Sequence, residues 1–242
     1  MLILAFETSA KAASVALADG EKLLGESYQN TGLTHSQTLL PMAQDLLKSC
    51  GYTPGQVEAV AVAAGPGSFT GIRIGVAAAK GFSWGKELPC YGVSTLEAMA
   101  LNLGIWDGYV LSVMDARRSQ VYNALFLAEG GKYTRLCDDR AISLSDLAKE
   151  IKTLEKPIFL VGDGSILCYN TLVKEVPNLV LPPEHRMHQR AAGVALVAEE
   201  ALAAGKPCDA ASLEPNYLRL SQAERERLEK TERSTNKKIK EN

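Results

Sequence analysis

The first residues of the chain that could bind a phosphate group or a metal ion follow a short apolar run at the N-terminus. Glu7, Thr8 and Ser9 come directly after residues 2–6, which we predict to form a strand. A carboxylate beside two hydroxyls at a strand end is suited to holding a metal-bound phosphate. The same residues are also typical of a polar strand end whose hydrogen bonds are made within the next turn, and by themselves they favour that plainer interpretation.

A glycine turn that includes Gly65 and Gly67 follows a second predicted strand at residues 57–64. Ser68 comes next and begins a helix, so backbone N–H groups of the helix start point toward one spot and favour an anion there. Known nucleotide motifs are absent, because a dinucleotide fingerprint would need glycine at Thr70 and no Gly-Lys-Ser/Thr sequence follows. The turn is equally compatible with a strand-to-helix connection that binds nothing.

Histidines and cysteines form no recognisable metal site or catalytic group in the sequence. His185 and His188 follow two prolines in a predicted loop, and His35 stands alone in the first turn of a helix. The five cysteines never occur in a CxxC pattern, which indicates reduced thiols. No HExxH, GxSxG or P-loop motif occurs. We therefore expect no metal and no cofactor, and a binding role in preference to catalysis.

Length and charge limit the kinds of partner and compartment. The 242 residues are 46% hydrophobic and 22% charged, which leaves room for one large domain or two smaller ones. The formal net charge is −2, so the chain has no basic surplus with which to hold nucleic acid on its own. No apolar run approaches about 18 residues. With its reduced cysteines, we expect a cytoplasmic protein that does not span a membrane.

Predicted strands and helices divide the chain into two lobes of α/β type. Residues 1–107 are predicted to contain three strands joined by tight turns, followed by alternating helices and strands. Residues 108–204 repeat this order less regularly and are predicted to form a smaller second lobe. Part of residues 205–220 is expected to pack back on the first lobe. Residues 221–242 are rich in Arg, Lys and Glu and predict a solvated tail.

Two helices of the first lobe have informative patterns. Residues 34–37 have the form of a capping box before a helix that ends near residue 49. In the next helix, near residues 68–84, Gly71, Gly75 and Ala79 recur at every fourth position and leave a shallow groove along one face. That groove fits close packing on the chain's own sheet or on a helix of another chain, and the sequence leaves both open.

Four motifs resemble those of a known protein family. They are LAFETS at residues 4–9, AGPGSFTGIRIG at residues 64–75, MDARR at residues 114–118 and PNYLR at residues 215–219. Together they resemble the TsaB family, formerly called YeaZ, and the resemblance runs from residue 1 to about residue 220. It implies the two-lobed fold of actin, sugar kinases and Hsp70 ATPases. It also implies a part in making threonylcarbamoyladenosine, the modified base beside the anticodon in some tRNAs.

The resemblance also implies how the chain acts. TsaB proteins are regarded as non-catalytic partners of TsaD, the related subunit that transfers the threonylcarbamoyl group, and they work with the ATPase TsaE. TsaD-like proteins carry two metal-binding histidines where Thr95 and Met99 stand here, and neither residue is a good ligand for a hard or borderline metal. The resemblance further implies a homodimer when TsaD is absent and contact with tRNA only through the complex.

Replacing Gly75 with leucine is expected to abolish TsaD binding without unfolding the chain. Two alternative functions stay open: an ATP-dependent, kinase-like enzyme that uses Glu7 and the glycine turn, and, less favoured, a metallopeptidase.

Two sets of residues also follow from the resemblance. The predicted interface with TsaD or with a second copy comprises Leu39, Pro41, Ala43, Leu46, Gly71, Ile74, Gly75, Ala78 and Ala79. The predicted vestigial phosphate-facing group comprises Glu7, Thr8, Ser9, Gly65, Gly67 and Ser68.

Overall fold

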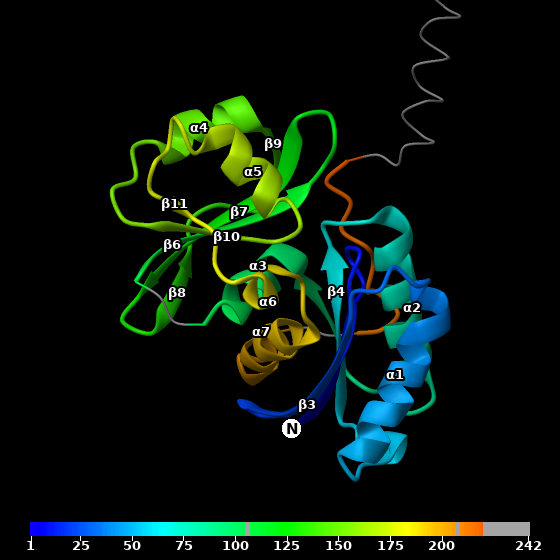
Figure 1. Ribbon diagram of the computed structural model, residues 1–242. Coiled ribbons are helices and arrows are strands. Elements are labelled where there is room, and N and C mark those ends of the chain that lie inside the picture. The colour runs from blue at the N-terminus through cyan, green and yellow to red at the C-terminus, as the bar shows by residue number, and fades with distance from the viewer. Residues whose placement is uncertain (105–106, 207–208, 220–242) are drawn as a thin grey trace, which may run out of the picture.

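The computed structural model describes residues 1–104, 107–206 and 209–219, and Figure 1 shows them as two lobes. Each lobe is built on a mixed sheet, so the predicted two-lobed α/β fold is confirmed. The predicted tail at residues 221–242 lies outside the described residues. Among the residues that are described, no helix is both long and apolar enough to cross a membrane.

The first sheet has the strand order β3-β2-β1-β4-β5. Its first three strands form two antiparallel hairpins, and β4 and β5 run parallel to β1. All residues of β1 are buried, as expected for a central strand covered on both faces. The strands predicted at residues 2–6 and 57–64 form close to those ranges. The five strands are β1 Leu2–Glu7, β2 Ala13–Asp19, β3 Lys22–Gln29, β4 Ala59–Gly65 and β5 Cys90–Ser94.

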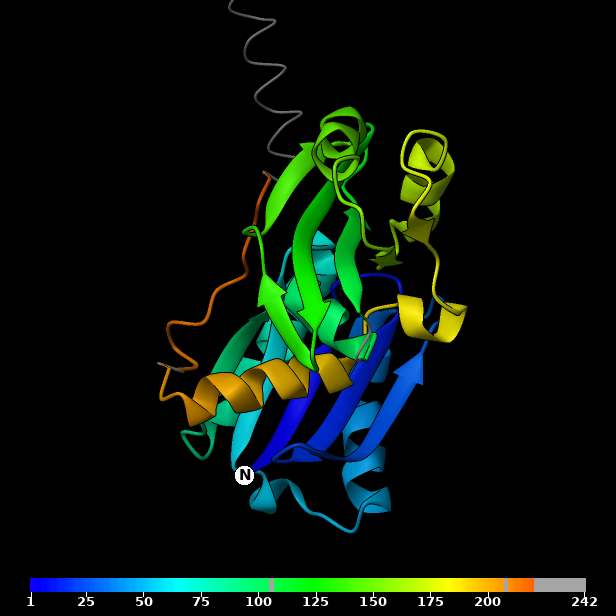
Figure 2. The ribbon, with the colours of Figure 1, turned by 90° about the vertical axis from the view of Figure 1, so that its left-hand side faces the viewer.

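The two faces of this sheet are covered by different helix pairs. Along β4, Val60 and Val62 belong to the core under α1 (His35–Ser49) and α2 (Phe69–Trp84). Ala59, Ala61 and Ala63 alternate with them and belong to the opposite core. That opposite core is built mostly of alanine and valine, so helices can approach the sheet closely. It is covered by α3 (Thr95–Asn102) and α7 (Ala191–Ala203), and Figure 2 shows α7 lying across the sheet.

Helix α7 packs on the first sheet, although the sequence placed it at the end of the second lobe. Val194 and Ala198 are buried in one core with Ile3 of β1. Gly193 lies so close to α3 that a Cβ atom there would collide with the carbonyl oxygen of Ala98. The helix is apolar on nearly every side, so its hydrophobic pattern could not indicate which sheet it covers.

The second sheet has the order β11-β10-β6-β7-β8, with β9 also paired to β7. One face carries α4 (Leu144–Ile151) and α5 (Ser165–Leu172), and the other packs on α3, which therefore lies between the two sheets. Residues 132–143 contain two short strands, and a short helix, α6 (Glu184–Met187), occupies the predicted loop that contains His185. The strands are β6 Gly108–Asp115, β7 Gln120–Glu129, β8 Lys132–Arg135, β9 Arg140–Ser143, β10 Ile158–Val161 and β11 Leu179–Val180.

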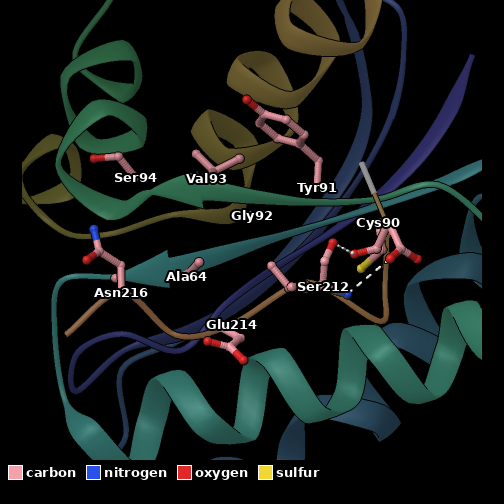
Figure 3. A pocket seen from close by; sticks show the side chains of 12 residues that line it. Ala64, Cys90, Tyr91, Gly92, Val93, Ser94, Ser212, Glu214 and Asn216 are labelled. Atoms are coloured by element: carbon pink, nitrogen blue, oxygen red, sulfur yellow. Dashed lines mark hydrogen bonds between the residues drawn. The ribbon is translucent and has the colours of Figure 1, made fainter. Parts of the chain in front are cut away.

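The segment after α7 returns to the first sheet. Leu213 is buried in the core under α1 and α2 and lies over Gly92 of β5. The backbone N–H of Asn216 donates a hydrogen bond to the carbonyl oxygen of Ala64 at 2.7 Å. Figure 3 shows this segment beside β4 and β5, where it borders a cleft of about 320 Å³. The last described residues of the chain thus complete the cover of the first sheet.

Candidate functional site

The end of β1 buries a carboxyl group. Glu7 is 1% exposed, and its Oε1 accepts a hydrogen bond from the backbone N–H of Ser9 at 2.5 Å. Its Oε2 has no hydrogen-bond partner within the described residues. Burial raises the pKa of Glu7 to about 7, and the nearby charge of Asp163 adds to the rise. The Glu7 carboxyl is therefore partly protonated near neutral pH.

Asp163 approaches this carboxyl group from the second lobe, in the glycine turn after β10. Its Oδ1 accepts a hydrogen bond from Nε2 of Gln189 at 3.1 Å, and the enclosing protein raises the pKa of Asp163. Sequence reasoning missed both residues. An acidic residue between two glycines, directly after a buried strand, was an available signal for Asp163. Nothing in the sequence pointed to Gln189.

The glycine turn packs against the end of β1. Ser68 caps α2, because its Oγ accepts a hydrogen bond from the backbone N–H of Gly71 at 3.3 Å, and its own N–H donates to the carbonyl oxygen of Ser9 at 2.6 Å. Thr8 donates its hydroxyl to the carbonyl oxygen of Gly71 at 2.7 Å. A Cβ atom at Gly67 would collide with Ser9. The hydroxyl of Thr8 thus joins the strand to the helix, and the hydroxyl of Ser68 caps the helix.

A cleft of about 490 Å³ lies between the lobes at this end of the first sheet. Ser9, Gly67 and Ser68 contribute to its wall, and the buried hydroxyl of Ser9 has no hydrogen-bond partner among the described residues. Gly65 is not part of this wall and lies against the carbonyl oxygen of Asn216. The rest of the wall comes mainly from the β6–β7 hairpin and residues 216–219. The predicted phosphate-facing residues therefore adjoin a real cleft, but not all of them face it.

The tip of the β6–β7 hairpin has an uncommon backbone. Arg117, Arg118 and Ser119 have φ angles of 65°, 56° and 56°, in the left-handed region. That region costs about 1–2 kcal/mol per residue for residues with a side chain. Nη1 of Arg117 lies 3.1 Å from Oδ2 of Asp115, and the arginine's backbone N–H donates to the same carboxylate. The turn therefore holds Arg117 at the mouth of the cleft.

Metal-binding geometry is absent from the part of the chain that the structure describes, since no three His, Cys, Asp or Glu side chains come together there. Thr95 and Met99 are buried, and Met99 packs between α3 and the second sheet. Nε2 of His35 forms a hydrogen bond with the carbonyl oxygen of Ala10 at 2.8 Å. The capping box predicted before His35 does not form, because Thr34 makes no side-chain cap bond.

The small-residue groove of α2 faces the chain's own sheet. A Cβ atom at Gly71 would collide with the carbonyl oxygen of Thr8, and one at Gly75 would collide with the hydroxyl of Thr8 and press on Val62. Ala79 is fully buried. The expectation that these three residues leave room for another chain is therefore wrong, as is the expectation that Gly75→Leu spares the fold. Both expectations fail because the end of β1 already occupies the groove.

Several other predicted interface residues are also internal. Leu39, Ala43 and Leu46 belong to the core under α1, because they lie on the side of the helix that faces the sheet. Ile74 and Ala78 are partly buried against that core. Pro41 is exposed, and its neighbour Leu40 is 49% exposed.

The outer face of α2 carries a line of uncharged residues, bordered on one side by Arg73 and Lys80. We call it the α2 seam and define it as Thr70, Ile74, Ala77, Gly81 and Trp84, which follow each other at alternating spacings of four and three. All are exposed except Ile74, which is partly so, and Trp84 is 80% exposed. Of these five residues, the interface predicted from sequence contains only Ile74, because that prediction was centred on Gly71 and Gly75 on the opposite face of the helix.

The chain is similar in sequence to proteins of tRNA modification. A family model described as TsaD, tRNA N6-adenosine threonylcarbamoyltransferase, matches residues 29–227. The tRNA threonylcarbamoyladenosine biosynthesis protein TsaB of Bacillus subtilis is 31% identical over 231 residues, covering 95% of this chain and 99% of that protein. The chain belongs to the TsaB family. TsaB of Escherichia coli is 34% identical over 222 residues, covering 90% and 95% of the two chains.

Solved structures agree with membership of the TsaB family. The structure of YeaZ from Pseudomonas aeruginosa superposes with a TM-score of 0.69 at 26% identity, covering 90% of this chain and 99% of that one. A ROK hexokinase from Thermus thermophilus shares the fold, with a TM-score of 0.51 at 12% identity, covering 85% of this chain and 100% of that one. The resemblance inferred from the four motifs is therefore confirmed, as is the fold it implied.

Proposed function

We propose that this chain is a non-catalytic subunit of the machinery that makes threonylcarbamoyladenosine in tRNA. In this role it binds the transferase subunit TsaD and supports it together with TsaE. Membership of the TsaB family supports the pathway. The observation that carries the binding role is the α2 seam, a line of uncharged residues that are exposed in the described chain except for the partly buried Ile74.

The composition of the α2 seam suits contact with another helix. Residues at alternating spacings of four and three stay on one side of a helix, as in the seam between packed helices. Thr70, Ala77 and Gly81 are small, so a second helix can approach the backbone closely. Trp84, exposed at one end, supplies the large aromatic surface that anchors many interfaces. Leu40 and Pro41 are exposed apolar residues of α1, the helix that contacts α2.

This interface replaces the inward-facing part of the predicted residue set. Its centre moves from Gly71, Gly75 and Ala79 to the opposite side of the same helix. A two-fold dimer uses the same patch on both subunits, and a second copy of the chain would present the same seam. We therefore expect a homodimer through the seam when TsaD is absent, and tRNA to be bound by the assembled complex.

The candidate site gives little support to a catalytic role. The hydroxyl of Thr8 is engaged by the backbone of α2, and Thr95 and Met99 stand at the positions expected of metal ligands in TsaD. The Glu7 carboxyl is sealed from solvent. A kinase-like or peptidase reaction would need a reactive group open to substrate, and these residues do not provide one.

Binding of TsaD to an Ala77→Glu variant tests the proposal. Ala77 is exposed, so the fold tolerates glutamate, but the charge would lie in the middle of the α2 seam. Isothermal titration calorimetry should show at least a tenfold weaker affinity for TsaD, because burying an unpaired carboxylate costs more than about 1.4 kcal/mol. The free variant should also shift from dimer to monomer in analytical ultracentrifugation.

Ile166→Glu serves as the matched control. Ile166 is 51% exposed on α5 of the second lobe, far from α2 in sequence, and the substitution introduces the same charge. It should bind TsaD like the unmodified chain. Circular dichroism and thermal melting should show both variants folded. Unchanged TsaD affinity of a folded Ala77→Glu variant would rule out the seam as the interface.

A further inference from the structure

The C-terminal segment crosses the mouth of the cleft between the lobes. On one side, the ring of Tyr217 stacks on that of Phe69 at the start of α2, with centroids 4.7 Å apart and planes 26° from parallel. On the other side, Nη1 of Arg219 donates a hydrogen bond to the carbonyl oxygen of Ala116 in the β6–β7 hairpin at 2.7 Å. The PNYLR motif is thereby fixed to both lobes, a role the proposed TsaD interface does not use.

Cationic side chains surround the same aromatic pair. Cζ of Arg73 lies 3.9 Å from the centre of the Phe69 ring, and its Nε donates to the hydroxyl of Tyr217 at 2.7 Å. Lys11 and Arg117 line the cleft beside them, and the Arg117 side chain is 84% exposed. We call Lys11, Phe69, Arg73, Arg117 and Tyr217 the cleft rim. It is a local gathering of positive charge on a chain whose net charge is −2.

The cleft rim combines two features that suit a strand of RNA. Tyr217 is 37% exposed; Phe69 packs on one face of its ring, and Cζ of Arg73 lies 5.7 Å from the ring centre. The exposed part of the ring is the surface that we assign to a base. Stacked aromatic rings bind bases of any sequence, and lysine and arginine side chains beside them bind the phosphates. Two carboxylates also line the cleft: Asp115 is paired with Arg117, and Asp163 accepts a hydrogen bond from Gln189. An acidic peptide would use the cations but would not need the exposed ring.

We propose that the cleft rim binds a single-stranded segment of RNA directly. The inference rests on the proposed function in one respect, namely that tRNA is the substrate of the assembled complex. It goes beyond that function because it assigns an RNA contact to this chain and names the residues that make it. The absence of a basic surplus over the whole chain does not oppose it, since the contact is local.

A paired charge reversal, Lys11→Glu with Arg117→Glu, tests the rim. Both side chains are exposed, so the fold should be retained. Fluorescence anisotropy with a labelled, unmodified tRNA transcript would be measured on the full chain alone and again with TsaD present. Affinity should fall at least about fivefold, and the slope of log affinity against log salt should become shallower by about two, one for each lost phosphate contact.

Lys22→Glu with Lys152→Glu is the control, because it changes the net charge equally at exposed positions on other elements. It should bind the transcript almost as the unmodified chain does. Tyr217→Phe keeps the ring and should retain affinity, whereas Tyr217→Leu keeps apolar contact with Phe69 but should lose affinity about fivefold. The leucine variant separates stacking from charge.

Two results would overturn the RNA contact. One is equal loss of affinity in the rim and control pairs, which would indicate only general electrostatics. The other is a polyglutamate peptide that binds as tightly as the transcript with the same dependence on Lys11 and Arg117. TsaD affinity, measured separately, distinguishes the two proposals. RNA affinity that stays unchanged in the rim pair, while Ala77→Glu weakens TsaD binding, rejects the rim alone. TsaD affinity that stays unchanged in Ala77→Glu, while the rim pair loses RNA affinity, rejects the TsaD interface alone.

Discussion

At the scale of single residues, the end of β1 keeps polar groups that the fold itself uses. Thr8 joins β1 to α2 through its hydroxyl, and the carbonyl oxygen of Ser9 accepts a hydrogen bond from the backbone N–H of Ser68. The sequence indicated both the polar strand end and its plainer interpretation, and the structure favours the latter for Thr8. Partners from distant parts of the chain, such as Asp163 beside Glu7, could not be predicted, because the two lobes bring them together only after folding.

Glu7→Gln should change the pH dependence of stability. The folded pKa of Glu7, about 7, lies above its unfolded value, so the folded state favours the protonated form. Its contribution to stability is full below about pH 4.5 and is lost as the pH rises toward 7. In the unmodified chain this amounts to about 2 kcal/mol of unfolding free energy between about pH 5 and pH 8.

The glutamine variant cannot ionise, so it should lack this decline. Urea unfolding at both pH values checks the difference between variant and unmodified chain, in which the contributions of other groups cancel. An identical decline in both proteins would show that Glu7 titrates in the folded state as it does in water.

At the scale of elements, α2 shows what periodicity can and cannot predict. Its pattern predicted the bounds of the helix closely and indicated Gly71, Gly75 and Ala79 as a close-contact face. It could not say which neighbour makes that contact, because a groove for a strand and a groove for a foreign helix require the same small residues. The α7 assignment failed for a similar reason, since apolar residues on every side of a helix carry no direction.

Two glycines of α2 should respond oppositely to alanine. Gly75→Ala should destabilise the fold by about 1–3 kcal/mol, because the added methyl group meets Thr8 and Val62. Gly81→Ala should stabilise it by about 0.5–1 kcal/mol, because nothing lies within 4 Å of the new Cβ atom and alanine favours the helix. Chemical denaturation of both variants checks the pair. Equal effects at the two positions would contradict the packing described for α2.

At the scale of the whole molecule, the chain is a two-lobed scaffold whose outer helix face and cleft rim lie on its surface. The motifs were sufficient to predict the fold and the family. The surface that remains for a partner could be located only after the contacts within the chain were known. Its exposed residues, Thr70, Ala77, Gly81 and Trp84, carry no motif that marks them in sequence.

Reconstituted threonylcarbamoylation of tRNA tests the central claim most directly, namely that the chain acts by contact and contributes no reacting group. The paired variant Glu7→Gln with Asp163→Asn removes both carboxylates at the junction of the lobes, and it should keep the modification rate within about twofold of the unmodified chain. Ala77→Glu leaves both carboxylates in place. It should lower the modification rate at least tenfold when the protein concentrations are near the dissociation constant for TsaD. Loss of modification in the carboxylate variant, with TsaD binding intact and the Ala77→Glu variant fully active, would contradict the account.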